Sequence, residues 1–334
     1  MNEIVKEKKG EQFFELIKGD TLIKNEHIKD SSVDLILTDL PFGVVKMKER
    51  EGNYKVLNTA EKWDKVLDTD KIMQIANRIL RKNGKMLLFA QQPFTTELIN
   101  KQIANLPHSY NLIWEKNDFA NGLGVNKAAV SFYEDIVLFS KNHETEAIHP
   151  LRKYFKKVMD YIGLNLKQIN TKLGHRRAEH SFYIDSTQYG LCTEKTYLEL
   201  IEVFNIDKAD GFKEFAELKE IDNQFKTQFS STFNLWEGGK YKSNILKYKK
   251  DYDGYHPTQK PVLLLEDLIK TFSNENDLVV DLTMGSGSTG VAAMNTNRNF
   301  IGIEKNDKYF NISVSRIKGE PVEINKKAEK FFSF

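Results

Sequence analysis

The sequence predicts an α/β protein whose open, mostly parallel sheet is built from both ends of the chain, with a mostly helical module inserted between them. Two stretches, 11–145 and 240–318, alternate short apolar runs with segments of helical period, as in a sheet covered by helices. Over 146–239 the strand-like runs disappear and charged segments of helical period replace them. Residues 319–334 form a C-terminal tail.

Composition restricts the class of protein. Hydrophobic residues make up 40% of the 334 residues and charged residues 29%, which allows a sizeable folded core. No apolar run approaches the ~18 residues of a membrane span, and the charged N-terminus does not resemble a secretory signal. We therefore expect a cytoplasmic protein. Cys192 is the only cysteine, which excludes a disulfide scaffold and a cysteine-based zinc cluster, and no metal site is expected.

The strands and helices follow from the position of apolar residues. The N-terminal stretch predicts a strand over 33–38, a helix over 70–80, and strands over 85–89 and 136–139, with a turn at Asn83-Gly84. The C-terminal stretch predicts two helices and two strands, over 261–272, 278–282, 288–296 and 299–304. The inserted module predicts helices over 151–162 and 166–173, separated at Gly163.

A glycine-rich turn, Gly285-Ser286-Gly287, follows the strand over 278–282 and precedes a helix. Glycines let a backbone approach a ligand closely, and a helix N-terminus favours a carboxylate or phosphate. The next strand ends at Glu304, and an acid there suits the two hydroxyls of a ribose. The glycine register differs from the G-x-G-x-x-G dinucleotide fingerprint. A nucleoside-cofactor site is favoured over a tight strand-to-helix turn alone.

A second motif, Asp39-Leu40-Pro41-Phe42, follows the strand over 33–38. Ligands of open α/β sheets bind beyond the carboxyl ends of strands, so these residues are placed for chemistry. Asp39 and the Leu40 carbonyl could each accept an N–H of an exocyclic amine while Phe42 stacks on the ring. By itself, the motif fits an ordinary Asp-Pro loop better.

Together the two motifs resemble those of the amino-directed DNA methyltransferases. Residues 39–42 resemble the family's [DNS]-P-P-[YFW] signature, although Leu40 replaces the usual first proline, and 281–290 resemble its S-adenosylmethionine loop. The segment 256–261 and the pair Gly19-Asp20 resemble two further family elements. The order, catalytic motif first and cofactor loop last, is similar to the β class.

This resemblance implies a Rossmann-like catalytic domain, S-adenosylmethionine as cofactor, and transfer of its methyl group to a base flipped out of double-stranded DNA. The leading residue Asp39 favours adenine N6, with cytosine N4 as the alternative. The catalytic residues it implies are Asp39, Leu40, Pro41 and Phe42. The cofactor residues it implies are Asp20, His256, Thr258, Gln259, Lys260, Asp281, Thr283, Gly285, Ser286, Gly287 and Glu304.

The inserted module resembles the place where this family puts its target-recognition part. Residues 152–177 hold eight Lys and Arg against one acid, Asp160, although the whole chain has a net charge of only +2. A helix, a short turn and a basic helix are compatible with a major-groove reader. The predicted DNA-binding residues are Arg152, Lys167, Lys172, His175, Arg176 and Arg177. The competing interpretation is a helical bundle that braces the catalytic domain and presents a solvated basic face.

Two other functions fit parts of the sequence. A DNA-binding regulator with a vestigial catalytic domain would explain the module but not intact motifs at Asp39 and Gly285. A nicotinamide-dependent oxidoreductase would explain the glycine turn but not its register. The β-class resemblance is compatible with a homodimer. The sequence shows no nuclease motif, so any restriction enzyme that accompanies this protein would be a separate chain.

Overall fold

The structure is a computed structural model of the 334-residue chain. It describes residues 4–41, 67–120, 129–142, 149–186, 188–229, 231–256 and 258–322. Phe42, the predicted stacking residue, lies outside this set. The chain forms two compact units, one of Met1–Asn142 with Ser231–Phe334, the other of His143–Ser230. The predicted insertion, 146–239, includes residues 231–239, which belong to the first unit.

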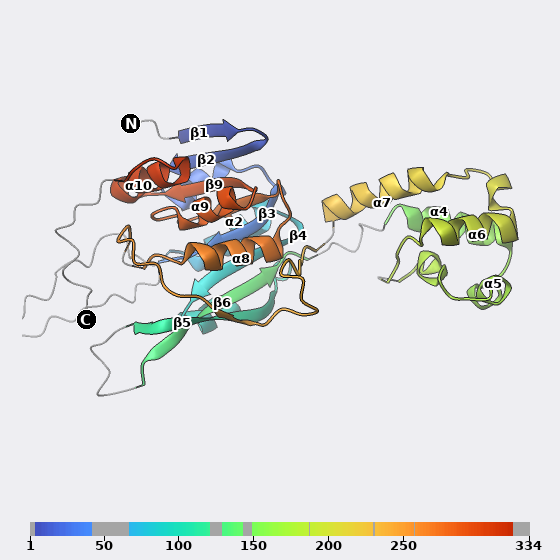
Figure 1. The fold of residues 1–334 in the computed structure, drawn as a ribbon, viewed down its shortest axis with the longest axis horizontal. Helices are drawn as coiled ribbons and strands as arrows, with labels where there is room; N and C mark the ends of the chain where they lie inside the picture. The colour runs from blue at the N-terminus through green and yellow to red at the C-terminus, as the bar shows by residue number, and fades with distance from the viewer. Residues whose placement is uncertain are drawn as a thin grey trace, which may run out of the picture. The chain divides into compact units, whose positions relative to one another are not determined.

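The first unit is built on a sheet of nine strands among the described residues, in the order β1-β2-β9-β8-β3-β4-β6-β5-β7 (Figure 1). Five of the eight neighbouring pairs are parallel, including the whole run from β2 to β4. The mostly parallel open sheet is thereby confirmed. The strands are β1 (Ile4–Lys9), β2 (Gln12–Lys18), β3 (Val33–Thr38), β4 (Leu80–Ala90), β5 (His108–Ala120), β6 (Ser131–Ser140), β7 (Ile245–Lys247), β8 (Leu278–Asp281) and β9 (Asn299–Glu304).

Helices cover both faces of this sheet. Because successive side chains of a strand point to opposite faces, Leu35 and Leu37 of β3 pack in one apolar core while Ile36 packs in the other. The first core is closed by α8 (Val262–Phe272), α9 (Ser288–Asn295) and α10 (Asp307–Lys318); the second by α2 (Thr69–Ile79) and α3 (Phe94–Asn100). A short helix, α1 (Thr21–Lys24), and a 3₁₀ turn, η1 (Asn25–His27), connect β2 to β3.

The strands predicted over 85–89 and 136–139 are both longer in the structure, and one predicted turn is wrong. The sequence predicts a turn at Asn83-Gly84 before a strand over 85–89, but β4 already begins at Leu80. The ladder with β3 passes from the pair Val33–Leu80 to the pair Leu35–Lys85, so the intervening residues bulge out of register. Asn83 takes a positive φ of 61° inside this bulge, which is why its sequence reads as a turn.

The second unit is helical, with an apolar core around Phe155, Tyr197 and Leu200. Its α4 ends at Gly163, whose φ is 69°, and Asn165 caps α5 through a capping box with Gln168. Both helices have their predicted bounds. The elements are α4 (Leu151–Ile162), α5 (Leu166–Leu173), η3 (Glu179–Phe182), α6 (Glu194–Phe204), η4 (Ile206–Lys208) and α7 (Phe215–Phe229).

Through the described part of the chain, no helix combines the length and the apolar character that crossing a bilayer requires.

Candidate active site

A row of alternating charges lies at the carboxyl end of β3. Asp39, directly after β3, accepts a hydrogen bond from Lys260 Nζ on its Oδ2 at 2.6 Å. Lys260 lies two residues before α8, and its ammonium is also 3.3 Å from Oε2 of Glu134 in β6. The other oxygen of Glu134 accepts from Lys116 Nζ of β5 at 2.7 Å. Three strands and one loop thus bring two carboxylates and two ammonium groups into one buried row.

Asp39 keeps one oxygen available. Its Oδ1 is buried and has no hydrogen-bond partner among the described residues, while Oδ2 is held by Lys260. Burial raises the pKa of Asp39 to about 6, and Lys260 opposes this rise. At neutral pH Asp39 is therefore a carboxylate with an unused acceptor, which is an arrangement that a folded protein rarely retains without a ligand.

The main chain at Asp39 is fixed from β8. Thr283 Oγ1 donates to the Asp39 carbonyl at 2.9 Å and lies 2.9 Å from Thr38 Oγ1. Thr38 Oγ1 also donates to Asp281 Oδ1 at 2.7 Å, and the Thr283 amide donates to the same oxygen at 3.0 Å. Asp281 and Thr283, predicted for the cofactor, thus also join the two motifs. The Leu40 side chain is buried in the core, which anchors the residue after Asp39.

The glycine turn is shaped by conformation and by helix packing. Gly285 and Gly287 have φ of 51° and 82°, a region in which L side chains are strained. A Cβ on Gly287 would lie 2.8 Å from Cβ of Ser313 in α10. Among the described residues, a Cβ on Gly285 would have only His256 within 4 Å, at 3.9 Å. Both glycines are expected to let the backbone approach a ligand. Gly287 instead lets the turn pack closely against α10, whereas Gly285 leaves space beside His256.

Glu304 and Asp20 come together at the adjacent ends of β9 and β2. Lys18 pairs with Glu304 in the parallel ladder, and the Gly19 amide donates to the Glu304 carbonyl at 2.9 Å. The Glu304 carboxylate accepts from the Gly285 and Asn306 amides at 2.9 and 2.6 Å. Asp20 caps α1 through Leu22 and accepts from Lys305 Nζ at 2.9 Å. The strand-end acid thus binds the glycine turn directly.

His256 packs beside the same turn. Its ring lies 4.3 Å from the Tyr309 ring of α10, and its Nδ1 lies 3.1 Å from Thr258 Oγ1. Burial, with Lys260 and Lys308 nearby, lowers the His256 pKa to about 4, so the imidazole is neutral at neutral pH. A neutral imidazole beside Gly285 can donate or accept a hydrogen bond without adding charge.

Two further contacts complete this side of the unit. Gln259 Nε2 donates to Asp253 Oδ2 at 3.1 Å, while its Oε1 is buried and unpartnered within the described residues. Arg316 of α10 donates to the carbonyl and the hydroxyl of Ser286 at 2.8 and 3.1 Å. Its guanidinium lies 4.4 Å from the Tyr255 ring centroid. Arg316 therefore fixes the serine between the two glycines.

Sequence reasoning missed Glu134 and Lys116. Both lie in strands far in sequence from either motif, and only the antiparallel pairing of β5 with β6 brings them to Lys260. The one feature of the sequence that could have indicated them is a charged side chain next to the apolar residues of a strand. The sequence assigns Lys260 to the cofactor, and the structure places its ammonium on Asp39.

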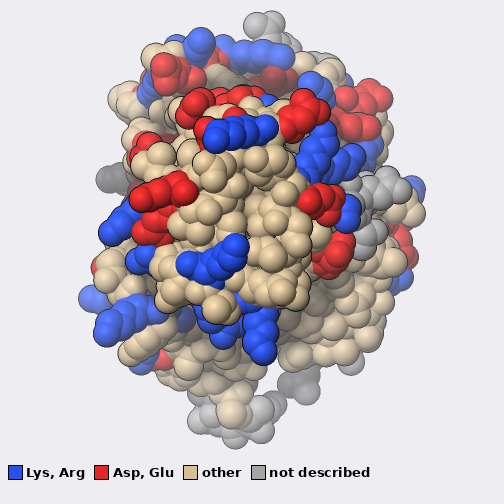
Figure 2. All heavy atoms as spheres, turned by 90° about the vertical axis from the view of Figure 1, so that its right-hand side faces the viewer, with Lys and Arg blue, Asp and Glu red and all other residues tan. Residues whose placement is uncertain are grey.

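The predicted DNA-binding residues lie in the helical unit, and four of them have partners there. Arg176 forms a two-bond ion pair with Glu179, and Arg177 and His175 both contact Glu199. Arg152 donates to the Ser186 carbonyl. In Figure 2, Lys and Arg lie among Asp and Glu on the face toward the viewer, with uncharged residues between them. The basic stretch is thus partly neutralised within its own unit.

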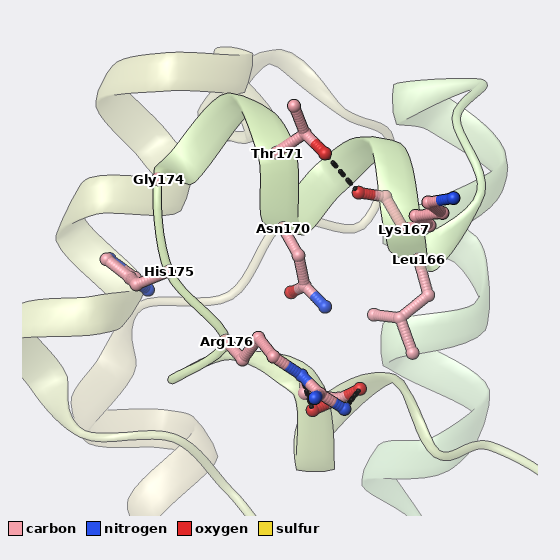
Figure 3. Close-up of a pocket in the computed structure, with 8 residues that line it drawn as sticks. Leu166, Lys167, Asn170, Thr171, Gly174, His175 and Arg176 are labelled. Carbon is pink, nitrogen blue, oxygen red and sulfur yellow. Dashed lines mark hydrogen bonds and ion pairs between the residues drawn. The ribbon is translucent and has the colours of Figure 1, made fainter.

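A groove of about 710 Å³ lies between α5 and the segment that follows it. Asn170 points into it from α5, and the Arg176–Glu179 ion pair lies across from it (Figure 3). Lys167 and Thr171 line the same groove. Apolar and polar groups both line it, and its charges are of both signs.

The open α/β sheet carries three features at one edge. They are an Asp-x-Pro loop with an unused acceptor, a glycine turn and an acid at the end of a strand. Residues 33–315 match the sequence model of the N6- and N4-directed DNA methylase family. The chain therefore belongs to this family of DNA methylases, and the resemblance to the β-class amino-directed enzymes is confirmed.

Relatives of known name match this chain over different lengths. The chain is 25% identical over 312 residues to DNA adenine methyltransferase YhdJ of Escherichia coli (strain K12), covering 92% of this chain and 84% of YhdJ. It is 42% identical over 87 residues to Type II methyltransferase M.HindIII of Haemophilus influenzae, covering 25% of this chain and 28% of that protein.

Solved structures support the fold. The crystal structure of the M1.HpyAVI–SAM complex has a TM-score of 0.51 at 18% identity, covering 91% of this chain and 98% of that chain. The cytosine-N4-specific PvuII DNA methyltransferase has a TM-score of 0.51 at 15% identity, covering 95% and 89%. The Rossmann-like fold is thereby confirmed.

Proposed function

We propose that this DNA methylase transfers the methyl group of S-adenosylmethionine to N6 of an adenine flipped out of double-stranded DNA. The observation that carries the proposal is the buried Oδ1 of Asp39 at the end of β3, which has no partner among the described residues. An exocyclic amine is the complementary group, because it brings N–H donors to an acceptor that is ionised at neutral pH.

Asp39 and the Leu40 carbonyl would accept the two N–H groups of the amine. The lone pair of an aromatic amine is delocalised into the ring, which makes the nitrogen a poor nucleophile. Accepting both N–H groups favours a tetrahedral nitrogen and orients it toward the methyl donor. We assign to Phe42 the stacking of the flipped base. No cysteine nucleophile is needed, and Cys192 is buried in the helical unit.

The residues around the glycine turn suit S-adenosylmethionine. Glu304 uses its carboxylate for two backbone amides but retains lone pairs for ribose hydroxyls, and Asp20 lies beside it. The space at Gly285 next to neutral His256 would admit the methionine end. When bound, the cofactor supplies an activated methyl group. Asp39 and the turn would then hold the two reactants in the orientation that transfer requires.

Adenine is favoured over cytosine by two observations. The motif begins with Asp, which the family resemblance associates with adenine N6. YhdJ, which matches 92% of this chain, is named as a DNA adenine methyltransferase. Cytosine N4 presents the same kind of amine to Asp39 and is the competing substrate.

We further propose that the helical unit reads the DNA. Lys167 and Lys172 are exposed on α5, and polar side chains, Asn170 among them, line the groove there. Exposed cations of this kind bind phosphates, and Asn170 can pair with a base edge.

The test is a single-turnover reaction followed by mass spectrometry of digested DNA. We expect N6-methyladenine from the wild type, near-complete loss with Asp39→Ala, and partial to severe loss with Asp39→Asn, because an amide adds a competing donor. Cofactor affinity should be almost unchanged in both variants. Wild-type activity in Asp39→Ala would exclude the mechanism, and N4-methylcytosine would exclude the substrate. Binding of DNA and S-adenosylmethionine without transfer would favour the regulator.

A further inference from the structure

We infer that Lys260, backed by Glu134 and Lys116, is a positioning residue that keeps Asp39 ionised and turns its Oδ1 toward the target amine. This inference rests on the proposed methyl transfer at Asp39. It gives Lys260 a role in the reaction rather than in holding the methionine end of the cofactor.

The geometry assigns one oxygen to each task. Lys260 Nζ holds Asp39 Oδ2 at 2.6 Å, so the carboxylate cannot rotate freely and Oδ1 stays buried without a described partner. The Lys260 side chain is only 8% exposed and that of Asp39 25% exposed, so water competes weakly for this bond. A carboxylate held by one oxygen presents the other in a defined direction.

Lys260 is itself held in place by Glu134. The distance from Lys260 Nζ to Glu134 Oε2 is 3.3 Å, and Glu134 Oε1 accepts from the 1%-exposed Lys116 side chain. Burial favours the neutral form of Lys260, but Asp39 and Glu134 outweigh it and raise the lysine pKa. Two negative and two positive charges therefore balance in a buried row, which lowers the cost of keeping each of them ionised.

The charges around Asp39 act in opposite directions. Burial is the largest influence and raises the Asp39 pKa, Glu134 of β6 and Asp281 of β8 raise it further, and Lys260 lowers it. Lys260 is the one cation among these influences. Without it, the Asp39 pKa would rise further, and a larger fraction of the carboxyl would present an O–H to the N–H donors of the substrate.

The reaction uses this acceptor twice. Before transfer, Oδ1 accepts an N–H of the amine. During transfer the nitrogen lone pair forms the C–N bond, the methyl C–S bond breaks and its electron pair stays on sulfur. The nitrogen then loses one proton, which ends on Asp39 Oδ1 as a new O–H bond and passes to solvent. A protonated Asp39 could not take up this proton, and with the hydrogen on Oδ1 it could not accept the N–H either.

The experiment measures single-turnover methyl transfer between pH 5.5 and 9 for wild type, Lys260→Met and Lys260→Arg. Wild-type activity should fall on the acid side with a midpoint near pH 6, as the Asp39 pKa requires. In Lys260→Met we expect a midpoint raised by about 1–3 pH units, and a fall of about 2- to 10²-fold at pH 7 as the ionised fraction of Asp39 decreases. Lys260→Arg should keep the wild-type midpoint.

Lys242→Met is the matched control, because Lys242 is also a buried ammonium bound to a buried carboxylate, at 2.5 Å from Asp267. It should lose stability as Lys260→Met does while keeping the pH midpoint and the rate of the folded enzyme. Circular dichroism checks folding. Should the single variant unfold, Lys260→Met/Glu134→Gln removes the excess negative charge that the loss of Lys260 leaves beside Lys116.

Three results separate the interpretations. An unchanged midpoint in a folded Lys260→Met variant would overturn the inference. Weaker S-adenosylmethionine binding with an unchanged midpoint would overturn it in favour of a cofactor role. A wild type that binds but never methylates would overturn the proposed function itself, whatever the variants do.

Discussion

At the scale of single residues, the site is marked by buried polar atoms that have no hydrogen-bond partner among the described residues. Asp39 is partly exposed, but its Oδ1 is buried and has no described partner, which lowers the stability of the folded chain unless a ligand supplies a donor. His256 is a partly buried, neutral imidazole. Residues that violate local rules of packing in this way mark functional positions more often than ordinary core positions.

Glu304→Ala should affect both cofactor and fold. The carboxylate holds the Gly285 and Asn306 amides, so its removal frees two backbone donors in addition to any ribose contact. We expect S-adenosylmethionine affinity to fall by roughly 1–3 kcal/mol, measured by calorimetry. Glu304→Gln, which keeps one acceptor oxygen, should lose less. Unchanged affinity in both variants would remove Glu304 from the cofactor site.

His256 should make unfolding pH-dependent. Its folded pKa of about 4 lies below the ordinary value of 6.5, so only the unfolded chain binds a proton between these values. Stability is therefore complete above pH 6.5 and is lost as the pH falls toward 4, by at most about 3 kcal/mol. Urea unfolding at pH 7.5 and 5 should show a smaller loss in His256→Gln than in wild type. His27→Gln, at an exposed histidine, is the control, and equal losses in all three proteins would contradict the assignment.

At the scale of elements, the sequence predicts those helices and strands whose own apolar residues show a clear period. The strands 33–38 and 299–304 and the helices 151–162 and 166–173 have the predicted bounds. The strands β1 and β7 escape prediction because they are mostly exposed or half-exposed and carry no buried run. The strand β2 also escapes it, although Phe14, Leu16 and Ile17 are buried. Both motifs of the site are visible in the sequence, since each follows a strand. The Lys260–Glu134–Lys116 row is not, because it depends on long-range pairing.

The junction of the glycine turn with α9 provides a test at this scale. Gly287→Ala combines a φ of 82° with a Cβ that would lie 2.8 Å from Ser313 Cβ. We expect a loss of roughly 2–5 kcal/mol in urea unfolding, the sum of a left-handed alanine and of overpacking. Gly319→Ala is the matched control, since Gly319 has a φ of 78° but no described residue would lie within 4 Å of its Cβ. It should lose only about 1–2 kcal/mol. Equal losses would show that packing against α10 is unimportant.

At the scale of the whole molecule, we assign chemistry and DNA recognition to two different units of the chain. The catalytic unit is assembled from both ends of the chain, so the helical unit can be changed without breaking the sheet. The net charge of +2 conceals this division, because basic and acidic stretches of the helical unit offset each other. DNA binding should therefore depend on which cations are free of carboxylates rather than on how many there are.

This reasoning predicts that Lys167→Ala/Lys172→Ala weakens DNA binding more than Arg176→Ala/Arg177→Ala. Both lysines are exposed on α5, and neither forms an ion pair with a described residue, whereas the two arginines are held by Glu179 and Glu199. Removing a phosphate-binding cation should reduce the slope of log affinity against log salt by about 0.9.

Removing the arginines instead leaves Glu179 and Glu199 without these cations, which adds repulsion toward DNA without removing a contact to it. Fluorescence anisotropy at several salt concentrations measures both quantities, with S-adenosylmethionine affinity as the control that should not change. Equal salt slopes for wild type and both double variants would identify the basic stretch as a solvated face, and a larger effect of the arginines would show that DNA displaces their carboxylate partners.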